Sequence, residues 1–151
     1  DDPGPAKAHE EVVLADLADR EKVMELVAGC DGILHFGGQA TEGPWQVVRD
    51  SNIEGLYNLY EAARHHGCRR IFYASSIHAV GYHPPTENLD DTIAIRPDTL
   101  YGVSKAFGEA LARFRRPSAL RGAEGQRRGG PELLAAGLVA LGANLGRRSA
   151  A

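Results

Sequence analysis

Tyr101 and Lys105 are four positions apart in the sequence Tyr-Gly-Val-Ser-Lys, and Ser76 lies 25 residues before Tyr101. Residues four apart share a helix face, so an ammonium at this spacing favours the phenolate and lowers the tyrosine pKa from about 10 toward neutrality. A tyrosinate can take a proton from a substrate hydroxyl while a serine hydroxyl holds the same oxygen. The three residues suit oxidation of an alcohol by hydride transfer to a nicotinamide, although the same spacing also occurs in ordinary helix pairs.

The elements that must position these residues alternate between short apolar runs and helical patterns. We expect buried strands at 11–15, 32–36 and 70–75, helices at 16–28, 42–66 and 100–113, and a long loop at 81–99. Near-continuous apolar strands are typical of a parallel sheet covered on both faces. The pattern predicts an α/β fold, a partial Rossmann-like doubly wound parallel sheet.

Several candidate residues fall where the expected strands end. Ligands of doubly wound sheets bind beyond the carboxyl ends of the strands. Asp16, the pair Gly37 and Gly38, Ser76 and the helix carrying Tyr101 all belong to that edge. Their convergence predicts a single site there.

Composition excludes several classes of protein. The net charge of −3 and the pI of about 6.1 argue against bulk electrostatic binding to nucleic acid or an anionic membrane. No apolar run reaches the roughly 18–20 residues that span a bilayer, and no signal peptide is recognisable. Two cysteines and scattered histidines form no metal or redox motif. We expect a reduced, cytoplasmic protein without a metal.

The segment after position 113 differs in composition. Residues 1–113 carry all the patterns above, whereas 114–151 are dominated by Ala, Arg, Gly and Leu. We expect one domain over 1–113 and a tail over 114–151 that is disordered or weakly helical, with a weak helix at 135–145 and no buried strand. A basic tail and a sequence read out of frame both fit this composition.

Four stretches, 30–38, 52–64, 72–76 and 100–105, resemble the extended short-chain dehydrogenase/reductase (NAD-dependent epimerase/dehydratase) family. Within it the chain is most similar to bacterial NAD-dependent uronate dehydrogenases. The resemblance implies Tyr101 as general base, Lys105 as the residue that activates it and holds the nicotinamide ribose, and Ser76 as ligand of the reacting oxygen. It implies NAD contacts from Asp16, Leu17, Phe36, Gly37, Gly38, Asn52, Tyr101 and Lys105, and substrate contacts from Ser75, Ser76 and His78.

Most of these assignments have a plainer structural alternative. Asp16 could be a turn residue, Gly37 and Gly38 a loop without a ligand, and Asn52 a satisfied amide inside a helix. His78 could be an ordinary loop histidine. Gly55 is expected to be a helix-packing contact rather than a ligand contact.

The chain also departs from the family it resembles. It has no G-x-x-G-x-x-G turn, and Ile77 stands where uronate dehydrogenases have asparagine. The chain therefore looks truncated at both ends. The resemblance implies a partial NAD-binding Rossmann-like domain over 1–113, without the first βαβ unit and the C-terminal substrate subdomain, and a non-homologous tail over 114–151. The resemblance implies oxidation of the C1 hydroxyl of a hexuronate to an aldarolactone. The alternatives are a nucleotide-sugar epimerase or dehydratase, and a catalytically inactive fragment or partner-binding remnant; a homo-oligomer stays open.

Overall fold

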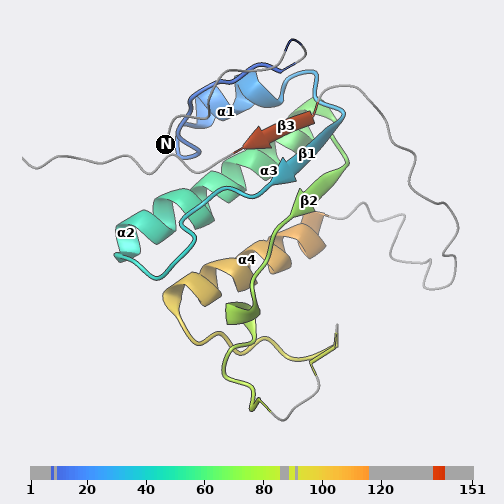
Figure 1. The fold of residues 1–151 in the computed structure, drawn as a ribbon. Coiled ribbons are helices and arrows are strands. Elements are labelled where there is room, and N and C mark those ends of the chain that lie inside the picture. The colour runs from blue at the N-terminus through green and yellow to red at the C-terminus, as the bar shows by residue number, and fades with distance from the viewer. Residues whose placement is uncertain (1–7, 9, 86–88, 91, 116–137, 142–151) are drawn as a thin grey trace, which may run out of the picture.

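The computed structural model describes residues 8, 10–85, 89–90, 92–115 and 138–141 (Figure 1). The elements are α1 (Arg20–Val27), β1 (Gly32–His35), α2 (Trp45–Val48), the π-helix η1 (Arg49–Glu54), α3 (Gly55–His66), β2 (Ile71–Tyr73), the short 3₁₀-helix η2 (Ile77–Ala79), α4 (Leu100–Arg115) and β3 (Leu138–Leu141).

The three strands form one parallel sheet in the order β2-β1-β3. Ile33 of β1 pairs with Ile71 of β2 on one side and with Val139 of β3 on the other. The parallel α/β architecture predicted from the alternating pattern is confirmed. Because β1 and β2 run in the same direction, their carboxyl ends deliver Phe36 and Ala74 to the same edge of the sheet.

In Figure 1, α3 runs along the sheet between α1 and α4. Asp19 caps α1 through a 3.0 Å bond from the Lys22 amide to its carboxylate, as expected from the sequence. The apolar faces of the helices meet β1 in one core. The buried members of this core are Leu17, Val23, Val27, Ile33, Leu56, Leu59, Tyr60, Ala62, Ala63, Cys68 and Leu111.

The helix expected at 42–66 is present but not uniform. It begins at Trp45, passes through the six-residue π-helix η1, and continues as α3 to Gly67, which ends it at φ 73°. A π-helix rotates the following side chains relative to a regular helix, and such segments are frequent at functional sites. Asn52, buried in η1, is one of the predicted site residues.

The strand expected at 11–15 is wrong. Residues 10–16 form no strand, and Val12, Val13 and Leu14 are 47%, 38% and 72% exposed. An apolar run shows that a segment can be buried, but a strand also needs a free neighbour. In the described part of the chain, β1 has β2 on one edge and β3 on the other.

The prediction for the tail is also wrong at four residues. Leu138–Leu141 fall within the weak helix expected at 135–145, but they form β3 and pair with all four residues of β1. The Leu-Val-Ala-Leu run is too short for its period to separate a helix from a strand, and the open edge of β1 decides. The other residues of 116–151 lie outside the described residues.

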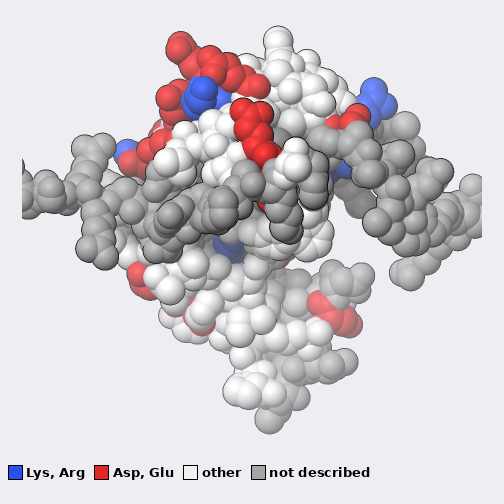
Figure 2. All heavy atoms as spheres, turned by 45° about the horizontal axis from the view of Figure 1, so that its top comes forward, with Lys and Arg blue, Asp and Glu red and all other residues white. Residues whose placement is uncertain are grey.

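Among the described residues, no helix is long and apolar enough to cross a membrane. On the face shown in Figure 2, Lys and Arg appear as separate small spots among acidic and uncharged side chains.

Candidate active site

Tyr101 and Lys105 lie one turn apart near the beginning of α4. The Lys105 ammonium is 5.5 Å from the centre of the Tyr101 ring. Thr99 starts the helix by accepting a 2.8 Å bond from the Gly102 amide, and Glu42 accepts a 3.0 Å bond from the Tyr101 amide. The backbone of the first turn, which carries Tyr101, is therefore held by side chains from two segments.

Lys105 is buried, with only 6% of its surface exposed. Its ammonium donates to the Ala74 carbonyl at 2.9 Å and lies 5.1 Å from the centre of the Tyr73 ring. No carboxylate among the described residues pairs with it, and burial lowers its pKa from the ordinary value. Its remaining N–H donors suit neutral or anionic oxygen ligands.

Two aromatic groups of the sheet lie beneath this lysine. His35 of β1 is 2% exposed and stacks on Tyr73 of β2 with the ring centres 5.9 Å apart. Burial, with a smaller contribution from Lys105, lowers the pKa of His35 to about 4. Burial raises the pKa of Tyr73. Both rings are therefore neutral at physiological pH, which leaves Lys105 as the charge at this position.

Ser76 caps η2, which packs against α4, and His78 of η2 lies beside Tyr101. The Ser76 hydroxyl accepts a 3.3 Å bond from the His78 amide, and the His78 ring meets the Tyr101 ring edge-on at 5.7 Å. The helices η2 and α4 approach so closely that a Cβ on Gly102 would lie 2.2 Å from the His78 carbonyl oxygen. The structure thus gathers Ser76, His78, Tyr101 and Lys105 within one region at the carboxyl end of β2.

Asn52 joins the loop after β1 to α4 by hydrogen bonds to Gln39 and Ser104. Gly38 has φ 112°, and a Cβ there would lie 2.4 Å from the Asn52 amide oxygen. Asn52 accepts from the Gln39 amide and the Ser51 hydroxyl, and donates to the Gln39 carbonyl and the Ser104 hydroxyl. These four bonds use the full capacity of the side chain. Asn52 is a satisfied helix amide that holds the loop at Gly38 and Gln39, and its contact with a cofactor stays a prediction.

Asp16 and Leu17 occupy the turn before α1. Asp16 is exposed, and its carboxylate accepts from the Ala18 amide at 2.9 Å. Leu17 is buried against Gly55, where a Cβ would lie 2.6 Å from the Leu17 Cβ, so the expected packing role of Gly55 is confirmed. Asn58 donates to the Leu17 carbonyl at 3.1 Å. The turn is anchored to α3 with the Asp16 side chain left toward solvent.

Phe36 and Ser75 have surroundings of different kinds. Phe36 is 61% exposed and its ring centre is 5.6 Å from that of Phe72. The Ser75 hydroxyl donates a 2.6 Å hydrogen bond to the Glu109 carboxylate. As substrate ligand, Ser75 stays a prediction.

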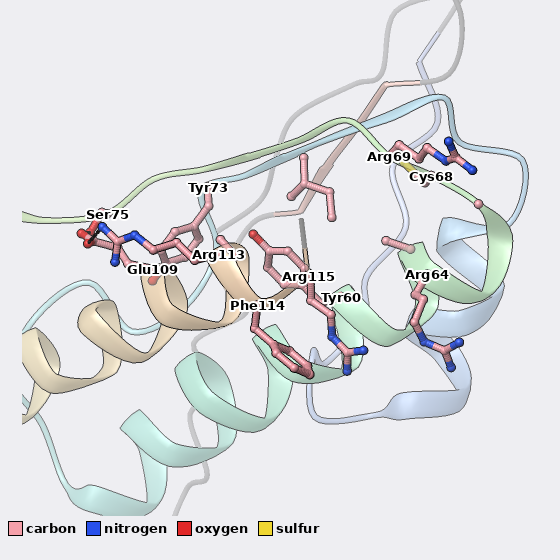
Figure 3. A pocket seen from close by; sticks show the side chains of 14 residues that line it. Tyr60, Arg64, Cys68, Arg69, Tyr73, Ser75, Glu109, Arg113, Phe114 and Arg115 are labelled. Carbon is pink, nitrogen blue, oxygen red and sulfur yellow. Dashed lines mark hydrogen bonds and ion pairs between the residues drawn. The ribbon is translucent and has the colours of Figure 1, made fainter. Parts of the chain in front are cut away.

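Ser75 also lines a cavity of about 880 Å³ between β2, the carboxyl end of α3 and the last turns of α4 (Figure 3). Figure 3 shows Ser75 and Glu109 together at one end, and Tyr60, Phe114 and Arg115 farther along. Tyr101 and Lys105 do not line this cavity. The cavity lies beside the carboxyl-terminal half of α4, whereas Tyr101 belongs to the first turn of that helix.

Sequence reasoning missed four supporting residues: Glu42, Asp98, Thr99 and Ser104. Thr99 could have been found, because Thr just before a helical pattern is a standard cap. Asp98, Glu42 and Ser104 act through contacts between distant segments, and the sequence carries no local signal for these. Among the described residues, no group of three or more His, Cys, Asp or Glu side chains could hold a metal.

A model of the NAD dependent epimerase/dehydratase family matches residues 2–122. The chain belongs to this family. The family resemblance drawn from the four sequence stretches is thereby confirmed.

The individual proteins to which the chain is similar include uronate and glucuronic acid dehydrogenases. Uronate dehydrogenase of Agrobacterium fabrum is 58% identical over 104 residues, which cover 69% of this chain and 39% of that protein. A crystal structure of mutant uronate dehydrogenase from Agrobacterium tumefaciens, complexed with NAD, is 56% identical with a TM-score of 0.71 and covers 73% of this chain and 42% of its own. A glucuronic acid dehydrogenase from Chromohalobacter salexigens is 54% identical with a TM-score of 0.73, covering 75% and 42%. The chain spans about two fifths of the length of these relatives.

Proposed function

We propose that this protein is an NAD-dependent dehydrogenase that oxidises the C1 hydroxyl of a hexuronate to an aldarolactone. The observation that carries the proposal is the 5.5 Å approach of the Lys105 ammonium, which is buried and has no carboxylate partner among the described residues, to the ring of Tyr101. The 58% identity to a uronate dehydrogenase supports the choice of substrate class.

The residues present fit a nicotinamide nucleotide. In the described part of the chain, the buried ammonium of Lys105 has one acceptor, the Ala74 carbonyl, and its other N–H groups can bind ribose hydroxyls. The loop around Gly38 lies at the carboxyl end of β1, where parallel sheets bind ligands, and the Asp16 carboxylate suits hydroxyl or amino groups of an adenosine. When bound, NAD⁺ supplies a hydride acceptor, the chemistry that the protein side chains lack.

Tyr101 is the residue that takes the proton from the C1 hydroxyl. Lys105, placed one turn away, brings its ammonium to 5.5 Å from the centre of the Tyr101 ring. The Ser76 hydroxyl, at the start of η2, donates to the same substrate oxygen and keeps it aligned. General-base catalysis of this kind contributes about 10²–10⁴-fold to a rate.

The first experiment is turnover of glucuronate and galacturonate by the purified 151-residue chain with NAD⁺, followed by the appearance of NADH. We expect Tyr101→Phe to lower kcat by at least about 10²-fold while the thermal unfolding midpoint is unchanged. Tyr82→Phe is the matched control, because Tyr82 is 66% exposed in the long loop, so its variant should keep full turnover.

Two results would count against the proposal. Turnover of nucleotide sugars without turnover of hexuronates would indicate the epimerase or dehydratase alternative. A folded chain that turns over neither would indicate an inactive fragment or a partner-binding protein.

A cytoplasmic location and a homo-oligomer stay predictions beside this proposal. Measurement of the molecular size during the same purification tests the homo-oligomer.

A further inference from the structure

We propose that Asp98 is a positioning residue that orients His78 and fixes its proton on Nδ1, so that Nε2 is presented to a hydroxyl of the bound sugar. The inference concerns the sugar side of the site and rests on the proposed function. Asp98 itself touches neither Tyr101 nor Ser76 through any hydrogen bond found among the described residues.

The contact between the two side chains is close and two-pronged. The His78 Nδ1 lies 2.9 Å from one Asp98 carboxylate oxygen and 3.1 Å from the other. His78 holds the pKa of Asp98 below its ordinary value, chiefly through this hydrogen bond. An ionised carboxylate only accepts, so the shared proton belongs to Nδ1.

The Asp98 carboxylate is held in place by the surrounding backbone. A Cβ on Gly81 would lie 2.2 Å from one carboxylate oxygen, so the group rests directly on the Gly81 backbone. The Asp98 amide donates to the His78 carbonyl at 3.4 Å, and the Arg96 amide donates to the Ala79 carbonyl at 3.1 Å. Thr99 donates its hydroxyl to the carboxylate at 3.3 Å. Asp98 therefore belongs to a short paired segment and not to a freely moving loop.

His78 in turn belongs to the reacting end of the site. Its ring contacts the Tyr101 ring at 5.7 Å, and its amide donates to the Ser76 hydroxyl oxygen. The side chain is 44% exposed, against 27% for Asp98, so the histidine is the member of the pair that a ligand can reach. Nδ1 is the ring nitrogen with a hydrogen bond among the described residues, which leaves Nε2 for the ligand.

The tautomer determines which sugar group His78 can bind. A neutral imidazole with its proton on Nδ1 has an unprotonated Nε2, which accepts a hydrogen bond. A hydroxyl can donate that bond, whereas a carboxylate has no proton to give. Neutral His78 therefore accepts a hydrogen bond from a sugar hydroxyl, and residues other than His78 must bind the substrate carboxylate.

The first test does not depend on activity. In the ¹⁵N-histidine-labelled full chain, at a pH where His78 is neutral, imidazole nitrogen NMR reports which nitrogen carries the proton. The His78 signals are assigned by their loss in His78→Gln. We expect Nδ1–H in the wild type and a shift toward Nε2–H in Asp98→Ala. An Nε2–H tautomer in the wild type, or no change in Asp98→Ala, would overturn the proposal.

Asp98→Asn keeps the shape of the side chain and covers the case in which Asp98→Ala does not fold. Its neutral amide accepts more weakly and can turn its NH₂ toward Nδ1, so we expect a reduced Nδ1–H population. The control is Asp90→Asn, in which a loop carboxylate bonded to Thr92 loses its charge. The His78 signals should be unaffected by this control variant.

The second test uses steady-state kinetics on hexuronates. We expect Asp98→Asn to raise KM roughly tenfold with kcat changed much less, because ground-state and transition-state contacts of His78 weaken together. An unchanged KM, or a fall in kcat alone, would contradict the positioning role. Absence of hexuronate turnover by a wild type with the Nδ1–H tautomer would overturn the proposed function and still support the orientation of His78.

Discussion

The amide nitrogen of Asn52 lies 2.9 Å from the hydroxyl oxygen of Ser104, and this bond joins η1 to α4 across 52 positions of sequence. The Ser104 hydroxyl in turn donates a 2.7 Å hydrogen bond to the Tyr101 carbonyl. The loop after β1, the π-helix and the first turn of the Tyr101 helix are thereby connected through two buried side chains.

We expect Asn52→Leu to lower the free energy of unfolding by about 2–3 kcal/mol, because it leaves the Gln39 carbonyl without its Asn52 donor and the Gln39 amide with only its 3.2 Å bond to the Ser51 hydroxyl. Ser104→Ala removes one bond and should cost about 1 kcal/mol. Urea unfolding of the single and double variants measures the coupling. A double variant whose loss equals the sum of the two single losses would show that the bond contributes nothing of its own.

Gly38→Ala is expected to destabilise the fold by about 1–3 kcal/mol, because φ 112° and contact with Asn52 both oppose a Cβ. Gly29→Ala is the matched control: Gly29 also has positive φ, at 79°, but nothing lies within 4 Å of the added carbon. Its cost should be about 1 kcal/mol, from conformation alone. Equal unfolding midpoints for the two variants would rule out the role of the Asn52 contact.

The buried His35 should make stability depend on pH. Its pKa is about 4 in the folded protein against an ordinary value of 6.5, so between these values the unfolded chain binds more protons. Stability contributed by neutral His35 is therefore present above pH 6.5 and is lost as pH falls toward 4, by about 3 kcal/mol over the full window. Denaturant unfolding at several pH values measures this slope.

His35→Gln should remove that part of the slope, since glutamine does not titrate. Identical pH profiles for wild type and His35→Gln would show that His35 is not held neutral by burial.

Lys105→Met should separate stability from activity. Burial without a described carboxylate partner lowers the pKa of Lys105, so its charged form costs folding free energy at neutral pH. The variant is expected to be as stable as the wild type or more so at pH 7, with the difference shrinking as pH rises toward the ordinary lysine pKa. NADH formation from hexuronates should be lost in the same variant, and retained turnover would remove Lys105 from the mechanism.

The predictions from sequence succeeded where a residue's role depends on its near neighbours. Helical spacing placed Tyr101 next to Lys105, the Asp19 cap started α1, and Gly67 ended α3. They failed at 11–15 and at Leu138–Leu141, because strand formation depends on which edge is free and not on apolarity alone. The proximity of Ser76 to Tyr101 was expected only because parallel strands end at a common edge.

By itself, the sequence determined the parallel α/β class and the family, and it predicted which side chains react, since periodicity, caps and short motifs are local properties. Only the tertiary structure decided the state of each group. It satisfied all hydrogen bonds of Asn52, paired Ser75 with Glu109, buried Lys105 with no carboxylate partner among the described residues, and paired Asp98 with His78. Burial and hydrogen-bond partners come from segments far apart in the chain, and no local pattern encodes them.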